Sequence, residues 1–385
     1  MVITSSPVQA VVLAGGGTAG HVNPLLSVAD ELRRRNPAVT VVALGTREGL
    51  EARLVPERGY PLEFLPRVPL PRRPSGEWAR LPGRLKAAVD AAGDAIDRAG
   101  AQAVVGFGGY VSTPAYLAAR RRGVPVVVHE QNARPGLANK LGARWAAQVG
   151  VTFPGTPLAG AVVTGLPLRH EVAELVERLA HDPAGTRAAA AAALGLDPAL
   201  PTLLVTGGSL GAQSLNTAVS GAARELLDGG GVQVLHLTGT GKSEPVLGAL
   251  AGLAGTERYH ALEYLAEMHL AYAVADLVLC RSGAGSVSEL AALGIPAVYV
   301  PLPIGNGEQR LNAAPVVEAG GGLLVADGDL TPAWVARKVP GLLGDRARLG
   351  AMAQAAATAG VRDGAARVAD LVERAARGGG HGATA

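Results

Sequence analysis

Short runs of Val, Leu and Ala alternate along the chain with longer segments in which apolar residues recur at helical spacing. The short runs are continuously apolar, a pattern typical of strands buried on both faces of a parallel sheet. Strands that alternate with helices predict βαβ units with right-handed crossovers. The expected strands are Val8–Ala14, Val39–Gly45, Ala103–Phe107, Val124–His129, Ala161–Thr164, Thr202–Thr206, Val232–Leu237, Leu277–Cys280 and Ala297–Pro301, and the first expected helix is Pro24–Arg35.

A strand that leads through a glycine loop into a helix occurs twice. Val8–Ala14 begins the first instance, and Thr202–Thr206 begins the second roughly 190 residues later. The length of 385 residues also suits two domains better than one. We therefore predict an α/β protein of two Rossmann-like domains, each with a doubly wound parallel sheet, joined near Gly165–Leu168.

Composition excludes several function classes. The formal net charge of +3 argues against a nucleic-acid binder driven by bulk charge. The single cysteine, Cys280, precludes an internal disulfide framework and fits a reducing compartment. The first residues lack the basic and apolar segments of a signal peptide, and no stretch of about 18 uninterrupted apolar residues occurs. We expect a cytoplasmic protein without a transmembrane helix.

Four glycine-rich loops after predicted strands carry the candidate chemistry. Glycine lets the backbone approach a ligand, and N–H groups at a helix N-terminus favour anions. Because two loops fall in each half, all four should converge on one crevice at the carboxyl ends of the strands. None ends in the Gly-Lys-Ser/Thr of a P-loop. The loops are Gly15–His21, Gly106–Ser112, Gly207–Ala212 and Arg281–Ser286.

The first loop also matches the dinucleotide pattern Gly-x-Gly-x-x-Gly, which is weak evidence alone. An NAD site further requires an acidic residue at the end of the second strand. Here that strand ends in Leu44, Gly45 and Thr46, so NAD is disfavoured. A tight turn that only packs the helix on the sheet remains an alternative interpretation.

Two other patterns have both a structural and a functional interpretation. Ser286-Val287-Ser288-Glu289 fits a capping box, and it equally fits a Glu289 carboxylate that receives two ribose hydroxyls. Asp327-Gly328-Asp329 resembles a metal-binding Asp-x-Asp. It precedes Thr331-Pro332, however, which is a helix start with Thr as N-cap. We interpret the second pattern as a turn and predict no metal site.

Six motifs in a fixed order resemble one family. The chain is similar to the MurG family, the N-acetylglucosaminyltransferases that convert lipid I to lipid II in bacterial cell-wall synthesis. The resemblance spans about residues 8–375, and the set of motifs is highly specific. The motifs are Gly16–His21, Gly108–Ser112, His129–Asn132, Gly207–Ala212, Arg281–Glu289 and Glu308–Ala313.

The resemblance implies a GT-B fold, in which two Rossmann-like domains face each other across a cleft. The acceptor and membrane domain is expected at 8–166 and the UDP-sugar domain at 167–361. A helix at about 362–377 is expected to pack back on the first domain, before a disordered tail at 378–385.

The resemblance also implies the reaction and the partners. The expected reaction is a metal-independent, inverting transfer of GlcNAc from UDP-GlcNAc to the muramyl 4-hydroxyl of polyprenyl-linked lipid I. The enzyme would be peripheral on the cytoplasmic face of the plasma membrane, in contact with its anionic surface and with the cell-wall synthesis machinery, and would bind no nucleic acid.

Site residues follow from the motifs in the same way. His21 is the expected general base, because a helix N-terminus disfavours imidazolium. A His21 that only holds the loop or the acceptor stays an alternative, and so does a catalytic role for Glu130 beside a structural His129. One departure is Glu308, where the family often has Gln, and a carboxylate cannot donate a hydrogen bond. The implied donor contacts are Thr18, Gly20, Asn132, Arg169, Ser209, Tyr264, Leu265, Met268, Ser286, Glu289, Glu308 and Gln309; the implied acceptor side is Gly17, Gly108, Gly109 and Tyr110.

A segment at 65–86 mixes apolar and basic residues, with Glu77 as its only acid. Apolar side chains could enter a lipid interface while cations meet anionic headgroups, and Trp78 suits that boundary. An ordinary basic loop leading into a helix whose leucines face the core fits equally well. The expected membrane patch is Leu70, Arg72, Arg73, Trp78, Arg80, Leu81 and Arg84.

Three rival functions remain at this point. One is another GT-B transferase with a natural-product or glycolipid acceptor. The others are an NAD-dependent oxidoreductase and a non-catalytic nucleotide-binding subunit.

Overall fold

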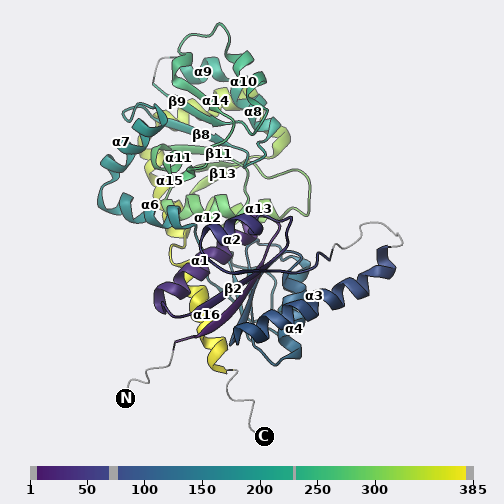
Figure 1. Cartoon of the computed structure of the whole chain (residues 1–385). Helices are drawn as coiled ribbons and strands as arrows, with labels where there is room; N and C mark the ends of the chain where they lie inside the picture. The colour runs from purple at the N-terminus through teal and green to yellow at the C-terminus, as the bar shows by residue number, and fades with distance from the viewer. Residues whose placement is uncertain (1–6, 69–76, 229–230, 379–385) are drawn as a thin grey trace. The chain divides into compact units, whose positions relative to one another are not determined.

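The chain folds into two α/β units, shown in Figure 1. The structure is a computed structural model that describes residues 7–68, 77–228 and 231–378. Unit 1 combines Met1–Arg169 with Asp363–Ala385, and unit 2 is His170–Arg362.

Unit 1 is built on a seven-stranded sheet in the order β3-β2-β1-β4-β5-β6-β7, with every pairing parallel. The strand order reverses between β1 and β4, which makes the carboxyl ends of these two strands the switch point. The strands are β1 (Ala10–Gly15), β2 (Thr40–Gly45), β3 (Leu62–Phe64), β4 (Ala103–Gly108), β5 (Val126–Glu130), β6 (Gln148–Val151) and β7 (Ala161–Val163).

Helices cover both faces of this sheet because its central strands are apolar on both sides. Val11 and Leu13 of β1 pack in one buried cluster with residues of α1 and α16, whereas Val12 and Ala14 pack in another with residues of α3 and α4. The alternation follows from the two-residue period of a strand. The helices are α1 (Ala19–Arg35), α2 (Glu51–Glu57), α3 (Glu77–Ala99), α4 (Ser112–Arg121), α5 (Leu137–Gly142) and α16 (Gly364–Gly378).

The last helix, α16, returns to unit 1 and lies beside α1 (Figure 1). Its Val368, Leu371 and Val372 are buried in the α1 face of the core. Arg35 of α1 donates hydrogen bonds to Asp370 at 2.6 Å and to the Ala366 carbonyl at 2.8 Å. The expected tail, 378–385, lies outside the described residues except for Gly378, which ends α16.

The first helix begins earlier than the sequence pattern predicted. It starts at Ala19, and Pro24 lies inside it rather than at its N-terminus. Proline lacks an N–H, so the helix loses one bond to the carbonyl four residues earlier, at Gly20. The missing bond lies in the second turn, and the carbonyl left without it belongs to Gly20, which is exposed and has no side chain. The consequence is that Gly20 and His21 belong to the first turn of α1.

Unit 2 repeats the plan with a six-stranded parallel sheet in the order β10-β9-β8-β11-β12-β13. Its switch point lies between β8 and β11. The strands are β8 (Thr202–Thr206), β9 (Gln233–Leu237), β10 (Tyr259–Leu262), β11 (Leu277–Cys280), β12 (Ala297–Tyr299) and β13 (Gly322–Leu324).

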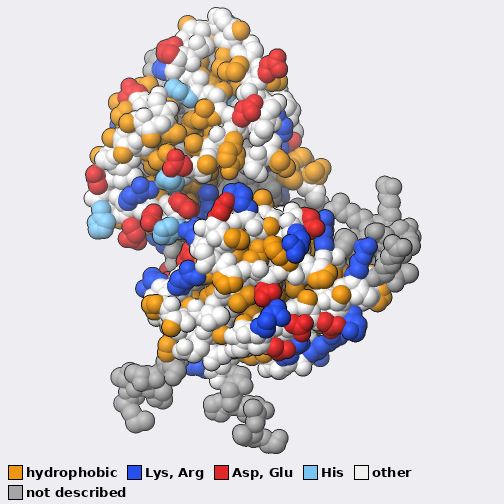
Figure 2. Space-filling view, in the orientation of Figure 1, with side chains coloured by type: hydrophobic (Ala, Val, Ile, Leu, Met, Phe, Trp, Pro, Cys, Tyr) orange, Lys and Arg blue, Asp and Glu red, His pale blue; other side chains and the backbone are white. Residues whose placement is uncertain are grey.

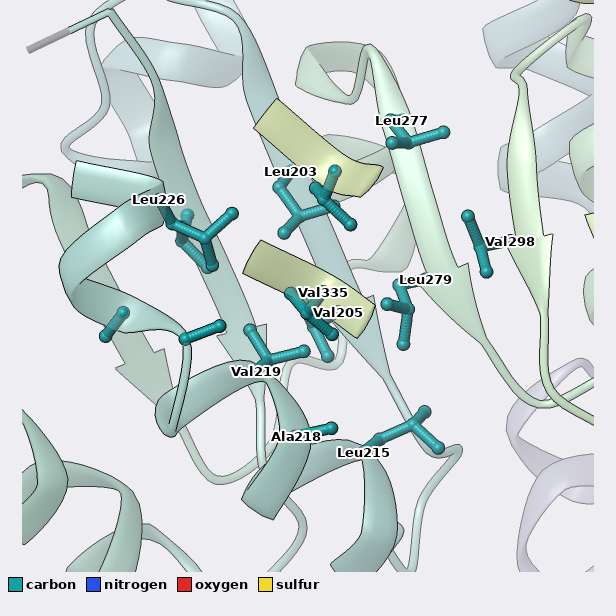
Figure 3. Packing of buried hydrophobic residues seen from close by; sticks show 14 of the residues in the cluster. Leu203, Val205, Leu215, Ala218, Val219, Leu226, Leu277, Leu279, Val298 and Val335 are labelled. Carbon is teal, nitrogen blue, oxygen red and sulfur yellow. The ribbon is translucent and has the colours of Figure 1, made fainter. Parts of the chain in front are cut away.

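The core of unit 2 is made of small aliphatic side chains from strands and helices (Figure 3). Leu203 and Val205 of β8 meet Leu279 of β11, Val219 of α8 and Val335 of α14 in one cluster. The helices are α6 (His170–His181), α7 (Pro183–Leu194), α8 (Gln213–Ser220), α9 (Ala223–Leu227), α10 (Ser243–Leu250), α11 (Met268–Val274), α12 (Ala284–Leu293), α13 (Glu308–Glu318), α14 (Pro332–Gly344) and α15 (Arg346–Ala359), with short 3-10 turns η2 (Thr256–Arg258) and η3 (Asp327–Asp329).

The predicted class, two Rossmann-like units with doubly wound parallel sheets, is confirmed. The sequence pattern missed β3, β6, β10 and β13, each of three or four residues and three of them at a sheet edge. Such strands carry too few apolar positions for their period to stand out. Among the described residues, no helix is long and apolar enough to cross a membrane.

Candidate functional site

All four glycine loops lie at the two switch points. The loops after β1 and β4 flank the reversal of strand order in unit 1, and those after β8 and β11 flank it in unit 2. Ligands of open α/β sheets bind outside the carboxyl ends of strands at such points. Each unit therefore presents one candidate site made of a pair of loops.

In unit 1 the two glycine loops touch backbone to backbone. A Cβ added at Gly109 would lie 2.5 Å from the Gly16 carbonyl oxygen, and Gly109 has φ +82°. Ser112 ties the same loops together: its hydroxyl contacts the Ala14 carbonyl at 3.0 Å and accepts from the Gly108 N–H at 3.0 Å. Only glycine permits this approach.

His21 projects from the first turn of α1 against these loops. Its Nδ1 lies 3.1 Å from the Gly16 carbonyl oxygen and 3.2 Å from Thr18 Oγ1. A carbonyl only accepts, so we assign the proton to Nδ1 and the lone pair to Nε2. Burial lowers the pKa of His21 below 6.5, and the Gly16 carbonyl and the charges of Glu130 and Glu51 oppose this shift. The ring is therefore neutral at neutral pH, with Nε2 available to take a proton.

His129 is a structural residue in unit 1. It is fully buried, its Nε2 donates to the Gly165 carbonyl at 3.1 Å, and its Nδ1 lies 3.1 Å from Gln131 Nε2. Burial lowers the pKa of His129 to about 4. Because both ring nitrogens have partners inside the protein, His129 has none left for a substrate.

Glu130 is likewise occupied by the fold. One carboxylate oxygen accepts from the Asn132 N–H at 2.9 Å, and the other accepts from the Gly136 N–H at 3.0 Å and from Asn139 Nδ2 at 2.9 Å. Asn139 in turn accepts from the buried Tyr116 hydroxyl at 2.8 Å. This network holds the turn that carries Asn132.

The predicted residues of the first loop and Tyr110 lie on the surface of unit 1, whereas Gly108 is buried. Gly17, Thr18 and Gly20 are exposed, and Tyr110 exposes 45% of its surface. Gly108 lies against the imidazole, since a Cβ there would be 3.1 Å from His21 Nε2. Of the residues expected on the acceptor side, Gly108 therefore borders the nitrogen that we assign as the free base.

No sequence pattern pointed to Glu51, whose side chain holds the first loop. Its carboxylate is fully buried and accepts from the Gly17 N–H at 2.8 Å, the Thr46 N–H at 2.8 Å and the Thr46 hydroxyl at 3.0 Å. The signal is hard to find in sequence, because the partners lie 34 and 5 residues away.

In unit 2 the third loop, 207–212, is tightly packed at its glycines and exposed at its middle residues. A Cβ on Gly207 would overlap the Ala212 backbone, and one on Gly211, which has φ +64°, would overlap the Thr238 carbonyl. Ser209 is exposed in this loop, four residues before α8 begins at Gln213. The loop thus offers backbone N–H groups and one hydroxyl at a helix start, a favourable place for an anion.

Arg281, the first residue of the fourth loop, joins several segments of this site through hydrogen bonds. Its guanidinium donates to Asp327 at 2.5 Å, to Ser214 at 3.0 Å and to the carbonyls of Val300 and Pro301 at 3.2 Å. Asp327 is engaged in this ion pair and also accepts from the Ser214 hydroxyl.

The Asp-x-Asp segment is a 3-10 turn, as its sequence context predicted. Thr331 caps α14 by accepting from the Trp334 N–H at 3.1 Å. Within residues 7–68, 77–228 and 231–378, no group of three or more His, Cys, Asp or Glu is placed to hold a metal ion.

The capping-box interpretation of Ser286 and Glu289 is wrong. The N-cap of α12 is Gly283, so both residues lie inside the helix. Glu289 is buried and accepts from the Tyr272 hydroxyl at 3.0 Å. With the cap interpretation removed, the buried carboxylate beside the fourth loop favours a binding role.

The other predicted residues of unit 2 lie on two segments. Tyr264 exposes 63% of its surface, and Leu265 and Met268 are half-buried at the entry to α11. Glu308 begins α13, and Gln309 Oε1 accepts from the Leu302 N–H at 2.9 Å. Gln309 therefore shapes the loop before α13, while Glu308 is half-buried at the helix start.

Only part of the expected membrane patch can be placed. Leu70, Arg72 and Arg73 lie outside the described residues, and the side chains of Trp78 and Arg80 are not described either. Leu81 and Arg84 are half-buried on α3. Leu65 and Val68, just before the patch, are buried and belong to the protein interior.

Sequence comparison places both units in one family. The profile of the glycosyltransferase family 28 N-terminal domain matches residues 11–151, and that of the family 28 C-terminal domain matches 202–368. A protein of Clavibacter michiganensis subsp. michiganensis is 57% identical over 366 residues, covering 94% of this chain and 95% of the relative. Its name is UDP-N-acetylglucosamine–N-acetylmuramyl-(pentapeptide) pyrophosphoryl-undecaprenol N-acetylglucosamine transferase.

The chain belongs to the MurG family of glycosyltransferases. A relative of the same name from Streptomyces avermitilis is 55% identical, covering 92% of this chain and 94% of the relative. The crystal structure of Acinetobacter baumannii MurG superimposes with a TM-score of 0.76 at 29% identity, covering 95% of this chain and 99% of that one. The two Rossmann-like units are accordingly those of a GT-B glycosyltransferase, and the NAD interpretation is dismissed.

Acidic and basic side chains are interspersed over the face drawn in Figure 2, and the net charge is only +3. A continuous basic stripe, as a nucleic-acid binder of this size carries, is not seen on that face.

The close contact of the two glycine loops in unit 1 predicts that a methyl group added at Gly109 destabilises the protein more than one added at an uncrowded glycine. Gly109→Ala should lower the free energy of unfolding of unit 1 by about 2–4 kcal/mol, since it combines a left-handed φ with a clash against Gly16. Gly123→Ala is the matched control: its φ is +68° and a Cβ there meets nothing within 4 Å. It should cost about 1–2 kcal/mol. Equal shifts in melting temperature for the two variants would contradict the contact.

Proposed function

We propose that this protein transfers GlcNAc from UDP-GlcNAc to the muramyl 4-hydroxyl of polyprenyl-linked lipid I, with inversion, to form lipid II. The observation that carries the proposal is the full-length identity of 57% to a transferase named for this donor and acceptor. The four glycine loops at the two switch points support it, because they supply an anion site and a base.

Unit 2 is proposed to bind the donor. Ser209 and the N–H groups of loop 207–212 would hold the diphosphate, with the positive end of α8 behind them. Glu289, buried beside the fourth loop, would receive the ribose hydroxyls. Tyr264, Leu265 and Met268 would border uracil, and Ser286 would line the nucleotide pocket. Glu308 and Gln309 would bind the sugar hydroxyls. Arg169, the last residue of unit 1 before unit 2 begins, would lie near the phosphates.

Unit 1 is proposed to supply the acceptor site and the base. A sugar hydroxyl is a poor nucleophile, so a group that removes its proton accelerates attack. His21 Nε2 would take that proton while the hydroxyl oxygen bonds to the anomeric carbon and UDP departs. Gly17, Gly108, Gly109 and Tyr110 would border the acceptor, and Thr18, Gly20 and Asn132 the donor sugar.

The departing UDP gains negative charge in this step. Backbone N–H groups at the starts of α8 and α12, together with Ser209 and Arg169, are proposed to stabilise it without a metal ion. The engagement of Asp327 with Arg281 supports this, since it removes the one Asp-x-Asp from metal binding. Single displacement converts an α-linked donor into a β-linked product.

The experiment that tests the function is turnover of UDP-GlcNAc with a lipid I analogue in EDTA. We expect UDP release and a β-linked disaccharide product at the rate seen with Mg²⁺. UDP binding without turnover would instead indicate a non-catalytic subunit, and turnover only with other acceptors would indicate a different GT-B enzyme. A loss of activity that Mg²⁺ restores would return Asp327 and Asp329 to consideration.

His21→Ala should lower kcat about 10²–10⁴-fold, the usual scale for loss of a general base. Because the pKa of His21 lies below 6.5, wild-type kcat should be constant through neutral pH and fall only when acid protonates Nε2. UDP binding, measured by calorimetry, should be unchanged in the variant. A near-normal kcat in His21→Ala would mean that another group is the base. His129 is a poor alternative, because its ring is buried and both ring nitrogens have hydrogen-bond partners inside the protein.

Glu289→Ala should raise the KM for UDP-GlcNAc by about 30–150-fold, the loss of a buried charged hydrogen bond worth about 2–3 kcal/mol. Its control is Tyr272→Phe, which removes one internal hydrogen-bond partner of Glu289 and keeps the carboxylate. A lower melting temperature with an unchanged KM would make Glu289 purely structural.

Peripheral attachment to the cytoplasmic face of the plasma membrane, through the patch on and before α3, is also proposed. Replacing Arg72, Arg73, Arg80 and Arg84 by Glu should abolish binding to anionic liposomes, since each cation contributes about 1 kcal/mol at such a surface. Turnover of a short-chain acceptor should persist. The matched control reverses four exposed cations of unit 2: Arg337, Lys338, Arg346 and Arg348. Liposome binding that survives the first change would dismiss the patch.

A further inference from the structure

Glu51 is a buried acid that the proposed chemistry does not use directly. It begins α2 and has no solvent exposure. Both carboxylate oxygens act as acceptors: Oε1 receives the Thr46 N–H and hydroxyl, and Oε2 receives the Gly17 N–H. Burying a carboxylate is costly unless donors surround it, so a fold that needed only a core side chain here would be served by an apolar residue.

One peptide group separates Glu51 from His21. The Gly17 N–H that donates to Glu51 and the Gly16 carbonyl that accepts from His21 Nδ1 belong to the same peptide unit. In a trans peptide the N–H and C=O point in opposite directions. Glu51 therefore lies on one side of the Gly16–Gly17 peptide and the imidazole on the other. Hydrogen bonds in such a chain polarise one another, which strengthens the carbonyl as an acceptor.

The neighbouring glycines leave the space that the Glu51 side chain occupies. A Cβ on Gly16, Gly45 or Gly49 would overlap the Glu51 side chain. These three residues come from the first loop, the end of β2 and the turn before α2. Only Gly109 approaches the other side of the loop as closely, at the Gly16 carbonyl itself. The loop is thus clamped between a carboxylate and a second glycine loop.

We propose that Glu51 is a positioning residue for the general base: its hydrogen bond to Gly17 orients the Gly16–Gly17 peptide so that the Gly16 carbonyl holds the proton of His21 on Nδ1 and leaves Nε2 as the base. The inference rests on the proposed function, in which His21 removes the proton of the acceptor hydroxyl. The arrangement serves the same end as the carboxylate–imidazole pair of a hydrolase triad, with a peptide group interposed.

Two acids act on the charge of this imidazole, Glu51 from α2 and Glu130 at the end of β5. Both favour the imidazolium, and removing either should lower the pKa of His21. A base is inactive once protonated, so a lower pKa moves the acid limb of the kcat profile to lower pH. A residue that only stabilises the fold would not move that limb.

The test compares Glu51→Gln, Glu51→Asp and a matched control, Glu57→Gln, on the same helix but exposed. Glutamine can satisfy the two Thr46 donors with its oxygen, but its NH2 then faces the Gly17 N–H and the link is broken. We expect Glu51→Gln to lower kcat about 10–100-fold, as a small displacement of a reacting group does. Its KM for UDP-GlcNAc should stay within about twofold of wild type, since the proposed donor contacts of unit 2 are untouched.

The acid limb of kcat should move to lower pH in Glu51→Gln and return toward wild type in Glu51→Asp, which keeps the charge. Glu57→Gln should match wild type in every measurement. A second readout needs no variant: two-bond ¹⁵N–¹H correlation spectra of the histidine-labelled wild-type protein should show neutral His21 protonated on Nδ1.

Wild-type His21 protonated on Nε2 would overturn the inference even if Glu51→Gln failed to fold. So would a Glu51→Gln variant with wild-type kcat and acid limb, or one whose kcat loss came only with a lower melting temperature and an unmoved limb. These outcomes are distinct from failure of the proposed function. If the proposed function is wrong, His21→Ala retains activity. If only the role of Glu51 is wrong, His21→Ala loses activity while Glu51→Gln keeps it.

Discussion

The contact between two glycine loops at the switch point of unit 1 is the constraint on which the proposed chemistry depends. A Cβ on Gly109 would lie 2.5 Å from the Gly16 carbonyl oxygen, and the Ser112 hydroxyl contacts the carbonyls of Ala14, in β1, and of Gly108. Parallel strands β1 and β4 end side by side, so their loops are forced together. A single methyl group in that contact would move the carbonyl that orients His21. If His21 is the base, as proposed, its activity depends on backbone packing as well as on the imidazole.

In unit 2 a side chain, rather than a contact between glycines, holds the loops at the switch point together. Arg281 bridges Asp327, Ser214 and two carbonyls after β12, and this holds the fourth loop against α8 and η3. The guanidinium has five donors in a rigid fork, which suits it to joining several segments at once. Unit 1 places a neutral base at its switch point, and unit 2 places backbone donors at its own. The same architecture is thus proposed to serve proton removal in one half and anion binding in the other.

The acid near the end of β2 distinguishes this protein from a dinucleotide-binding enzyme. In the dinucleotide fold an acidic residue at that position faces the ligand and binds a ribose. Here β2 ends at Gly45, Thr46 follows, and the nearby acid, Glu51, faces inward to the glycine loop. The charge acts on the loop and on His21 instead of on a cofactor. A Gly-x-Gly-x-x-Gly match without this structural context therefore indicates the fold and not the ligand.

The sequence by itself determined the class of fold, because continuous apolar runs and glycine loops after strands are local patterns. It also indicated the family, since six motifs lay in order. It could not find Glu51 or the role of Arg281, whose partners lie on other segments and meet only when the sheets form. The sequence pattern likewise placed the start of the first helix at Pro24 and offered a capping box at Ser286, whereas the structure begins α1 at Ala19 and has Gly283 as the N-cap of α12. Local residues specify elements, whereas the partners of a buried polar group are specified only by the packed chain.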